Sequence, residues 1–283
     1  VTVDLRKPVL DSEKPVATTT PPVEQPRTSP GDPELPAKQP VEVVRVVFDA
    51  TKVAPIPAVV IPDQEKPYVV INKEGESVAE YKFITEVLPI LNDGEILEVR
   101  GNGPFKLPQI VREKQSLHIR AGKGYRPQFV PDFKLSETQF NNWIVLQDVT
   151  LLIEGCDFTG SVANGFALFG GNGPHWSFHS CRLIQPASHN AFILGFIGQR
   201  LTVRDSLLTC HSAYFTTNFG PKVQAEFHNN VVFNSSTFLG CQPGHGSSFT
   251  LKSNLIYNTQ LLSLNEQQGD DPLEVVAEDN LFV

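Results

Sequence analysis

The fold of this chain is decided by a stretch that reads Leu151-Leu152-Ile153-Glu154-Gly155-Cys156-Asp157-Phe158. The same pattern returns five more times, and its central position is occupied in turn by Cys156, Cys181, Ser206, Asn230, Asn254 and Asn280. Successive central positions are 25, 25, 24, 24 and 26 residues apart. A nearly constant period in this range predicts a solenoid, in which each repeat packs on its two neighbours.

The residues around each central position alternate between apolar and polar, as they do in a half-buried strand. Apolar residues stand five places before it (Leu151, Trp176, Leu201, Ala225 and Phe249), three places before it (Ile153, Phe178, Val203, Phe227 and Leu251) and two places after it (Phe158, Leu183, Leu208, Val232 and Ile256). The spacing of three and four that a helix needs is absent. Each repeat therefore predicts strands with one buried face.

A second apolar segment follows each pattern after about one loop, at residues 166–169, 192–194, 214–215, 238–239 and 261–264. Two or three short strands in each period, with Gly and Asn at the corners, predict an all-β fold of the parallel β-helix type. Rungs of such a fold stack about 4.8 Å apart, so equivalent residues form columns along its axis. We expect the small polar residues of the central column to hydrogen-bond the backbone at a corner, and stacked asparagines to form a ladder.

With these repeats, residues 68–283 resemble the pectin-lyase-like superfamily of right-handed parallel β-helices. The resemblance implies the fold, a right-handed solenoid. It implies no single activity, because such folds host lyases, hydrolases, esterases, adhesins and scaffolds.

The segment before the first regular rung carries a helix signal. Ser77-Val78-Ala79-Glu80 matches a capping box, and apolar residues follow at Tyr81, Ile84, Val87, Leu88 and Leu91 before Asn92-Asp93-Gly94. We expect a helix here that closes the N-terminal end of the solenoid, because an uncapped rung would expose a strand edge and the core.

Three regions follow from composition. Residues 1–40 hold nine prolines, so we expect a disordered Pro-rich linker that cannot bury enough apolar surface to order itself. Residues 41–75 contain apolar runs and are expected to form an extended docking segment. Residues 76–283 are expected to form the β-helix. We expect this β-helix to be cut inside a rung at Val283, and we expect flanking domains in a longer chain.

Charge and hydropathy exclude some partners. The chain has 283 residues and a net charge of −8, which argues against nucleic acid because phosphate binding needs a basic field. No apolar run reaches the roughly 18 residues that a membrane-spanning helix needs. Cys156 and Cys181 fall in one column on adjacent rungs; two buried thiols are the favoured interpretation, and a disulfide between them stays open.

No catalytic set, metal site or cofactor site is predicted. Gly244-His245-Gly246 resembles the Gly-His-Gly of polygalacturonase-type hydrolases, but the carboxylates that precede it in that family are missing, and Asp270-Asp271 comes after it. A turn is the simpler interpretation. Glu154 with Asp157 would make only a weak Ca²⁺ pair. A serine nucleophile needs an adjacent base, and Gly-x-Ser-x-Gly does not occur.

One outward column is the candidate binding site. It stands two places before each central residue and contains Glu154, His179, Arg204, His228 and Lys252, with Asp157 and Arg182 on the next outward positions. Such a strip could hydrogen-bond an extended glycan or peptide along the solenoid axis. The alternative is a polar face that only keeps the sheet soluble.

A further resemblance concerns context. Arg100-Gly101-Asn102-Gly103-Pro104-Phe105, with the segment from Leu117 to Pro127, resembles the opening rungs of β-helix regions in large bacterial multidomain proteins, some of which carry a Ser/Thr kinase domain and a membrane anchor. It implies a non-catalytic, extracytoplasmic module that senses or binds a polysaccharide or another cell-surface ligand. A polysaccharide lyase or glycoside hydrolase is the first alternative, and an adhesin-like spacer is the second.

Overall fold

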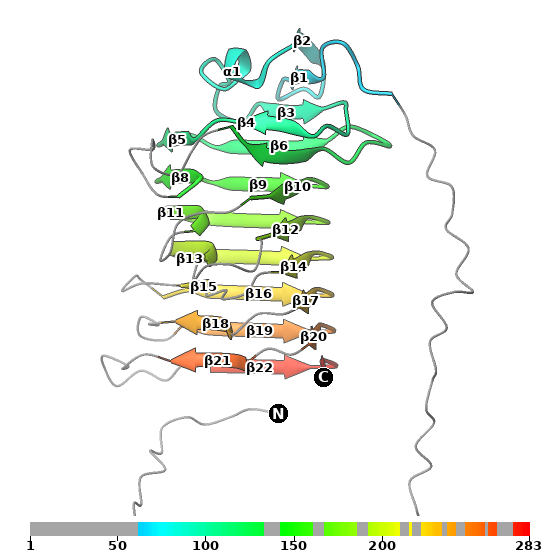
Figure 1. Ribbon diagram of the computed structural model, residues 1–283. Helices are drawn as coiled ribbons and strands as arrows, with labels where there is room; N and C mark the ends of the chain where they lie inside the picture. Colours follow the sequence, from blue (N-terminus) through cyan, green and yellow to red (C-terminus); the bar gives the residue numbers. More distant parts are fainter. Residues whose placement is uncertain are drawn as a thin grey trace, which may run out of the picture. The chain divides into compact units, whose positions relative to one another are not determined.

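Short strands stack in register to form a parallel β-helix in the computed structural model of this protein (Figure 1). The structure describes residues 62–132, 142–160, 167–185, 192–209, 215–216, 222–233, 237–241, 247–257, 260–264 and 274–283. All of them belong to one compact unit. The all-β, parallel β-helix class expected from the repeat is confirmed. The linker expected at residues 1–40, and residues 41–61 of the docking segment, lie outside the described residues.

The largest sheet, sheet A, follows the whole solenoid. Its long path runs through β2 (Ser77–Tyr81), β1 (Tyr68–Ile71), β3 (Ile96–Val99), β6 (Leu117–Ala121), β9 (Leu151–Glu154), β11 (Ala167–His179), β13 (Phe192–Arg204), β16 (Gln224–His228), β19 (Ser248–Lys252) and β22 (Glu274–Glu278). Three further strands join it at the side: β5 (Ile110–Glu113), β8 (Ile144–Gln147) and β15 (Phe215–Thr216). Every pairing from β3 onward is parallel.

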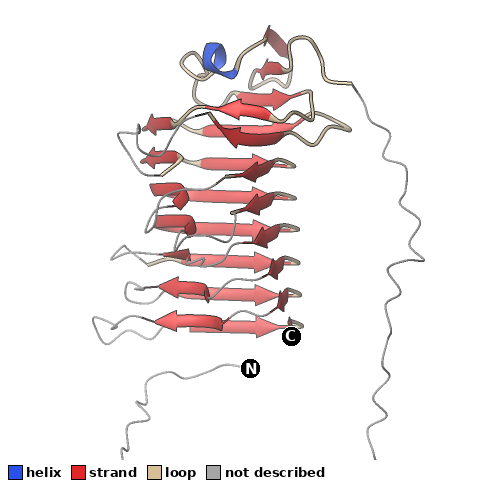
Figure 2. Ribbon diagram, viewed as in Figure 1, coloured by secondary structure: helices blue, strands red, loops and turns tan. Residues whose placement is uncertain are grey.

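Sheet B follows each corner, and sheet C closes two later rungs (Figure 2). The strands of sheet B are β4 (Phe105–Leu107), β7 (Gln128–Pro131), β10 (Asp157–Thr159), β12 (Arg182–Ile184), β14 (Leu207–Thr209), β17 (Val231–Phe233), β20 (Leu255–Tyr257) and β23 (Leu281–Phe282). Sheet C pairs β18 (Thr237–Cys241) with β21 (Gln260–Leu264).

The inward columns predicted from the alternation form the core. All fifteen residues of the three apolar columns are buried, with relative exposures of 2% or less. Aromatic rings continue the stack from rung to rung, because the ring centroids of Phe129, Phe158, Phe169 and Phe178 follow one another at 5.0 Å. The core is therefore a column of equivalent side chains.

The corner between sheets A and B has the same geometry in each regular rung. The residue before each central position has a positive φ: 70° at Gly155, 54° at Ser180 and Asp205, 52° at Asn229, 56° at Ser253 and 53° at Asp279. Small and Asn or Asp residues tolerate this left-handed region best. The left-handed residue turns the chain and directs the central side chain inward.

The central column forms the expected ladder. Asn230 and Asn254 donate through Nδ2 to the carbonyl oxygens of Val203 and Phe227, both at 2.9 Å. The backbone N–H groups of Asn230 and Asn254 donate to the Oδ1 atoms of Asn254 and Asn280, at 3.0 and 2.9 Å. The side-chain amides are thus satisfied partly by the preceding rung, and the backbone N–H groups by the next one.

Cys156 and Cys181 continue this column as free, buried thiols. The Sγ of Cys156 lies 3.3 Å from the Glu154 carbonyl oxygen, and that of Cys181 lies 3.2 Å from the His179 carbonyl oxygen. Burial raises the pKa of both thiols, that of Cys181 to about 12. The structure therefore contains the buried thiol pair and no disulfide between these two residues.

The helix expected from Ser77 to Leu91 is wrong in its extent. Residues Ser77–Tyr81 form β2, which pairs antiparallel with β1, and α1 is a single turn over Ile84–Val87. The four residues of β1 are all buried, so its edge needs hydrogen-bond partners, and this demand outweighs the local capping signal. Ile84, Val87 and Leu91 still close the N-terminal end of the core.

Two long strands, β11 and β13, bend without a break in the strand. Both contribute to the outer face of sheet A. The first half of β11 pairs with β8 and its second half with β9. Glycine is required at the bend, because a Cβ on Gly171 or Gly173 would collide with the carbonyl oxygen of Leu146 or Val149. Gly198 repeats the arrangement on β13, where a Cβ would meet the carbonyl oxygen of Gly173.

In the part of the chain that the structure describes, no helix combines the length and apolar character needed to cross a bilayer.

Candidate functional site

The five sheet residues of the predicted strip form one column. His179 is paired in register with Glu154 on one side and Arg204 on the other, and His228 follows Arg204 and precedes Lys252. The same register extends the column to Glu98 and Arg120 at its start and to Glu278 at its end. The strip is therefore part of a longer row of acidic, basic and histidine side chains on the outer face of sheet A.

Charges at both ends of this row pair with one another. Arg120 Nη2 lies 2.7 Å from Glu98 Oε2, and Lys252 Nζ lies 3.4 Å from Glu278 Oε2. Burial opposes ionisation of Glu98, but hydrogen bonds from Arg100 and Arg120 outweigh it and lower the pKa of that carboxyl. These end pairs stabilise the sheet surface, so the middle of the row is the better candidate for contacting a ligand.

Asp157 and Arg182 lie on a different surface from the other five residues. They follow the corner and stand in register on β10 and β12 of sheet B. Arg126 Nη2 lies 2.7 Å from Asp157 Oδ1, and Arg182 Nη1 lies 3.6 Å from Asp157 Oδ2. The seven predicted residues therefore lie on two sheets, five in one column of sheet A and two on sheet B.

Glu154 is instead the centre of a polar cluster on three strands. His118 Nε2 lies 2.7 Å from Glu154 Oε2, and His179 Nδ1 lies 3.7 Å from Glu154 Oε1. The other ring nitrogen of His179, Nε2, lies 2.7 Å from Ser177 Oγ. Sequence reasoning missed Ser177 and His118. The available signal was the column four places before each central residue, which places Ser177 beside His179 on the same face.

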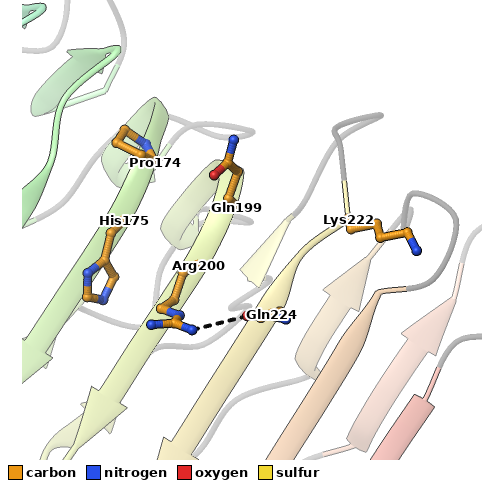
Figure 3. A pocket seen from close by; sticks show the side chains of 6 residues that line it. All are labelled: Pro174, His175, Gln199, Arg200, Lys222 and Gln224. Atoms are coloured by element: carbon orange, nitrogen blue, oxygen red, sulfur yellow. Dashed lines mark hydrogen bonds between the residues drawn. The ribbon is translucent and has the colours of Figure 1, made fainter.

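A polar hollow of about 550 Å³ lies beside this cluster. It is lined by Pro174, His175, Gln199, Arg200, Lys222 and Gln224. Figure 3 shows these side chains along the ends of neighbouring strands, with Arg200 Nη2 donating to Gln224 Oε1 at 3.3 Å. Register explains the grouping, since His175, Arg200 and Gln224 are direct neighbours on β11, β13 and β16. Among the residues that the structure describes, none that lines this hollow is a carboxylate.

Two histidines of this face favour the neutral form. Burial lowers the pKa of His175, and the nearby Arg200 lowers it further. Burial and Arg204 likewise lower the pKa of His179, against a smaller opposing effect of Glu154. At neutral pH both imidazoles can therefore accept a proton, while the fixed positive charge of the face comes from arginine and lysine.

A second hollow, of about 450 Å³, lies at the corner and is lined by side chains of both charges. Arg126, Arg182, Asp205 and Asn229 are among its lining residues, and Asn229 Nδ2 donates to Asp205 Oδ1 at 2.7 Å. Its cations already contact Asp157. The hollow on sheet A is therefore the stronger site for a charged ligand.

Metal chemistry and the hydrolase motif receive no support from the described ranges. Within them no group of three or more His, Cys, Asp or Glu side chains could hold a metal ion. Gly244-His245-Gly246 and Asp270-Asp271 lie outside the described residues.

Comparison of the chain with protein-family models, with curated proteins and with solved structures finds no match. The fold and the geometry of the outer face of sheet A are thus the basis for assigning a role.

Proposed function

We propose that the outer face of sheet A binds an extended acidic polysaccharide. The observation that carries this proposal is the hollow lined by Arg200, Lys222 and His175, with no carboxylate among its described lining residues, in a chain whose net charge is −8. A local concentration of cations on an acidic protein selects a ligand with negative groups. Carboxylate or sulfate groups on the glycan would receive charge-assisted hydrogen bonds from Arg200 and Lys222.

The shape of the surface supports an extended, hydroxyl-rich ligand. Strands β11, β13, β16 and β19 lie parallel and in register, so they present equivalent side chains at steps of about 4.8 Å. Gln199 and Gln224 line the hollow, while Thr202 and Glu226 stand in register on the adjacent outward positions of β13 and β16. Amide and hydroxyl groups of this kind donate and accept hydrogen bonds and suit a sugar better than an apolar ligand.

The proposed context is a β-helix binding module of a longer protein, acting outside the cytoplasm and related to the pectin-lyase-like superfamily. Support for the relationship comes from the period of the repeat, the left-handed corner and the polar ladder. A polysaccharide ligand fits this context because its length matches a face that continues over several rungs.

Binding to sodium polygalacturonate, alginate and neutral dextran, measured by isothermal titration calorimetry, tests the proposal. We expect binding to the two acidic polymers, weakening with added salt, and none to dextran. Replacing both Arg200 and Lys222 with Ala should lower affinity by about 10- to 100-fold, since charge-assisted hydrogen bonds are lost.

The matched control is Lys106→Ala with Lys123→Ala, which removes the same formal charge from exposed positions outside the hollow. Equal loss in both double variants, or equal binding of dextran, would reject a specific site. Incubation with the same polymers, with and without Ca²⁺, followed by absorbance of unsaturated products, tests the lyase alternative, and turnover would favour it.

A further inference from the structure

We propose that Ser177 is an acyl-accepting nucleophile, with His179 as its general base and Glu154 as the group that orients the base. The substrate class is an ester, namely an O-acyl group carried by the polysaccharide. The choice of polysaccharide rests on the proposed function, whereas the chemistry of the three side chains does not. The activity goes beyond binding, because it would remove acyl groups from the bound ligand.

The three side chains are arranged in space as nucleophile, base and orienting group. Ser177 Oγ lies 2.7 Å from His179 Nε2, within hydrogen-bond reach of a base, and His179 Nδ1 lies 3.7 Å from Glu154 Oε1. An activated serine is recognised by a neighbouring base that is itself oriented by a third group. With a proton on Nδ1 facing Glu154, Nε2 is left to accept the Ser177 hydroxyl proton.

Rigid strands hold the arrangement in place. Ser177 and His179 are two residues apart on β11, so their side chains emerge on the same face. Glu154 comes from the neighbouring β9 in register with His179, and its second oxygen lies 2.7 Å from His118 Nε2 on β6. His118 therefore fixes the carboxylate that orients His179, as a positioning residue. Ser177 itself is 4% exposed, so the strands around it hold the side chain in place.

The protonation state and the neighbouring charge suit acyl transfer. Burial and Arg204 keep the pKa of His179 below its ordinary value, so the unprotonated ring, which can accept the serine proton, predominates at neutral pH. On β13, Thr202 is in register with Ser177 and Arg204 with His179. A hydroxyl and a guanidinium beside the nucleophile can stabilise the oxyanion that forms when the carbonyl is attacked.

The reaction balances without an added cofactor. Ser177 Oγ attacks the ester carbonyl carbon while its proton moves to His179 Nε2, and the tetrahedral oxyanion forms. Collapse breaks the bond to the sugar oxygen, which leaves with the proton from His179, and an acyl-serine remains. Water, deprotonated by His179, then attacks the acyl carbon, and the carboxylic acid departs as the serine regains its proton.

Labelling of the intact protein with a small fluorophosphonate, followed by peptide mass spectrometry, tests the nucleophile directly. We expect one adduct, on Ser177, together with measurable hydrolysis of p-nitrophenyl acetate. Ser177→Ala should abolish the adduct and lower hydrolysis at least about a hundredfold. The control Thr250→Ala, which removes a hydroxyl three rungs further along the same column, should keep both.

The role of Glu154 is tested separately, by the kinetics of the reporter ester. Glu154→Gln keeps the size of the side chain but weakens the orientation of His179, so kcat for the reporter ester should fall and its pH profile should shift. A variant whose kcat and pH profile match the wild type would remove Glu154 from the scheme.

The reporter ester carries no sugar, so these results are independent of polysaccharide binding. Absence of an adduct on Ser177 in the folded wild-type protein overturns this proposal, even if acidic polymers bind. Labelling of Ser177 without binding of acidic polymers would keep the nucleophile and reject the proposed function.

Discussion

The asparagine ladder gives single residues a large effect on stability. Asn254 donates to the Phe227 carbonyl oxygen and to Asn280 Oδ1, at 2.9 and 2.8 Å, and accepts from the backbone N–H of Asn230 at 3.0 Å. Because the residue is 2% exposed, no water can replace these partners. The ladder is thus a continuous hydrogen-bond network along the core, and its members depend on one another.

Asn254→Ala should destabilise the protein by about 2–4 kcal/mol, because it leaves a buried carbonyl and a buried N–H without partners. Urea unfolding measures the change in the free energy of unfolding. Thr250→Ala, on the outer face of β19 just before this corner, should cost well below half as much. Equal losses in the two variants would mean that the ladder contributes little.

Lower pH should destabilise the folded state through His175. Burial, Arg200 and His179 lower its pKa below the ordinary 6.5, against an opposing effect of Glu226. The unfolded chain therefore binds the proton more readily, so stability is complete above about pH 6.5 and declines as pH falls through the lower folded pKa. Thermal unfolding at pH 7 and pH 5 should show a smaller drop for His175→Gln than for the wild type; equal drops would contradict this.

At the scale of elements, the bends in β11 and β13 decide where the candidate site stands. Gly171, Gly173 and Gly198 let the two strands pass close to the carbonyl groups of their neighbours. Pro174-His175 and Gln199-Arg200 follow directly after these bends. The polar hollow therefore depends on backbone packing that only glycine allows.

Gly173→Ala should destabilise the protein by about 1–3 kcal/mol, because its Cβ would overlap the Val149 carbonyl oxygen. Gly195→Ala is a close control, since its Cβ would meet the Ala167 Cβ at 3.4 Å, an ordinary contact. Differential scanning calorimetry should show a lower Tm only for Gly173→Ala. A similar fall in both variants would indicate a general intolerance of side chains at this bend.

At the scale of the whole molecule, the solenoid is held together by contacts between neighbouring rungs. Each rung of sheet A pairs with the next one, and α1 with β2 closes the first. Stability in such a fold is approximately a sum over adjacent units. A substitution that destabilises one end should consequently unfold only that end and leave the remaining rungs folded.

Arg112 offers a test of that locality. Its guanidinium donates to the carbonyl oxygens of Leu88 and Leu91, at 3.1 and 2.7 Å, and so ties the cap segment to β5. Arg112→Ala should speed amide hydrogen exchange in residues 84–91 by at least about tenfold and leave β16 and β19 unchanged. Faster exchange throughout the solenoid would show that the cap and the rungs unfold as one unit.

Sequence alone specifies the repeating part of this protein. The period, the inward columns at Leu151, Ile153 and Phe158 and the corner column that begins at Cys156 can all be read from spacing. They are readable because alternation within a strand and stacking between rungs are local, periodic properties. The same reasoning placed Glu154, His179 and Arg204 in one outward column.

Only the tertiary structure decides the arrangements that join different strands. It makes Ser77–Tyr81 a strand, because the buried edge of β1 requires hydrogen bonds that a local helix signal does not register. It separates Asp157 and Arg182 from the strip, because a left-handed corner lies between the sheets. It brings Ser177, His179 and Glu154 together and opens the hollow beside them, since side-chain contacts depend on register across rungs whose loops differ in length.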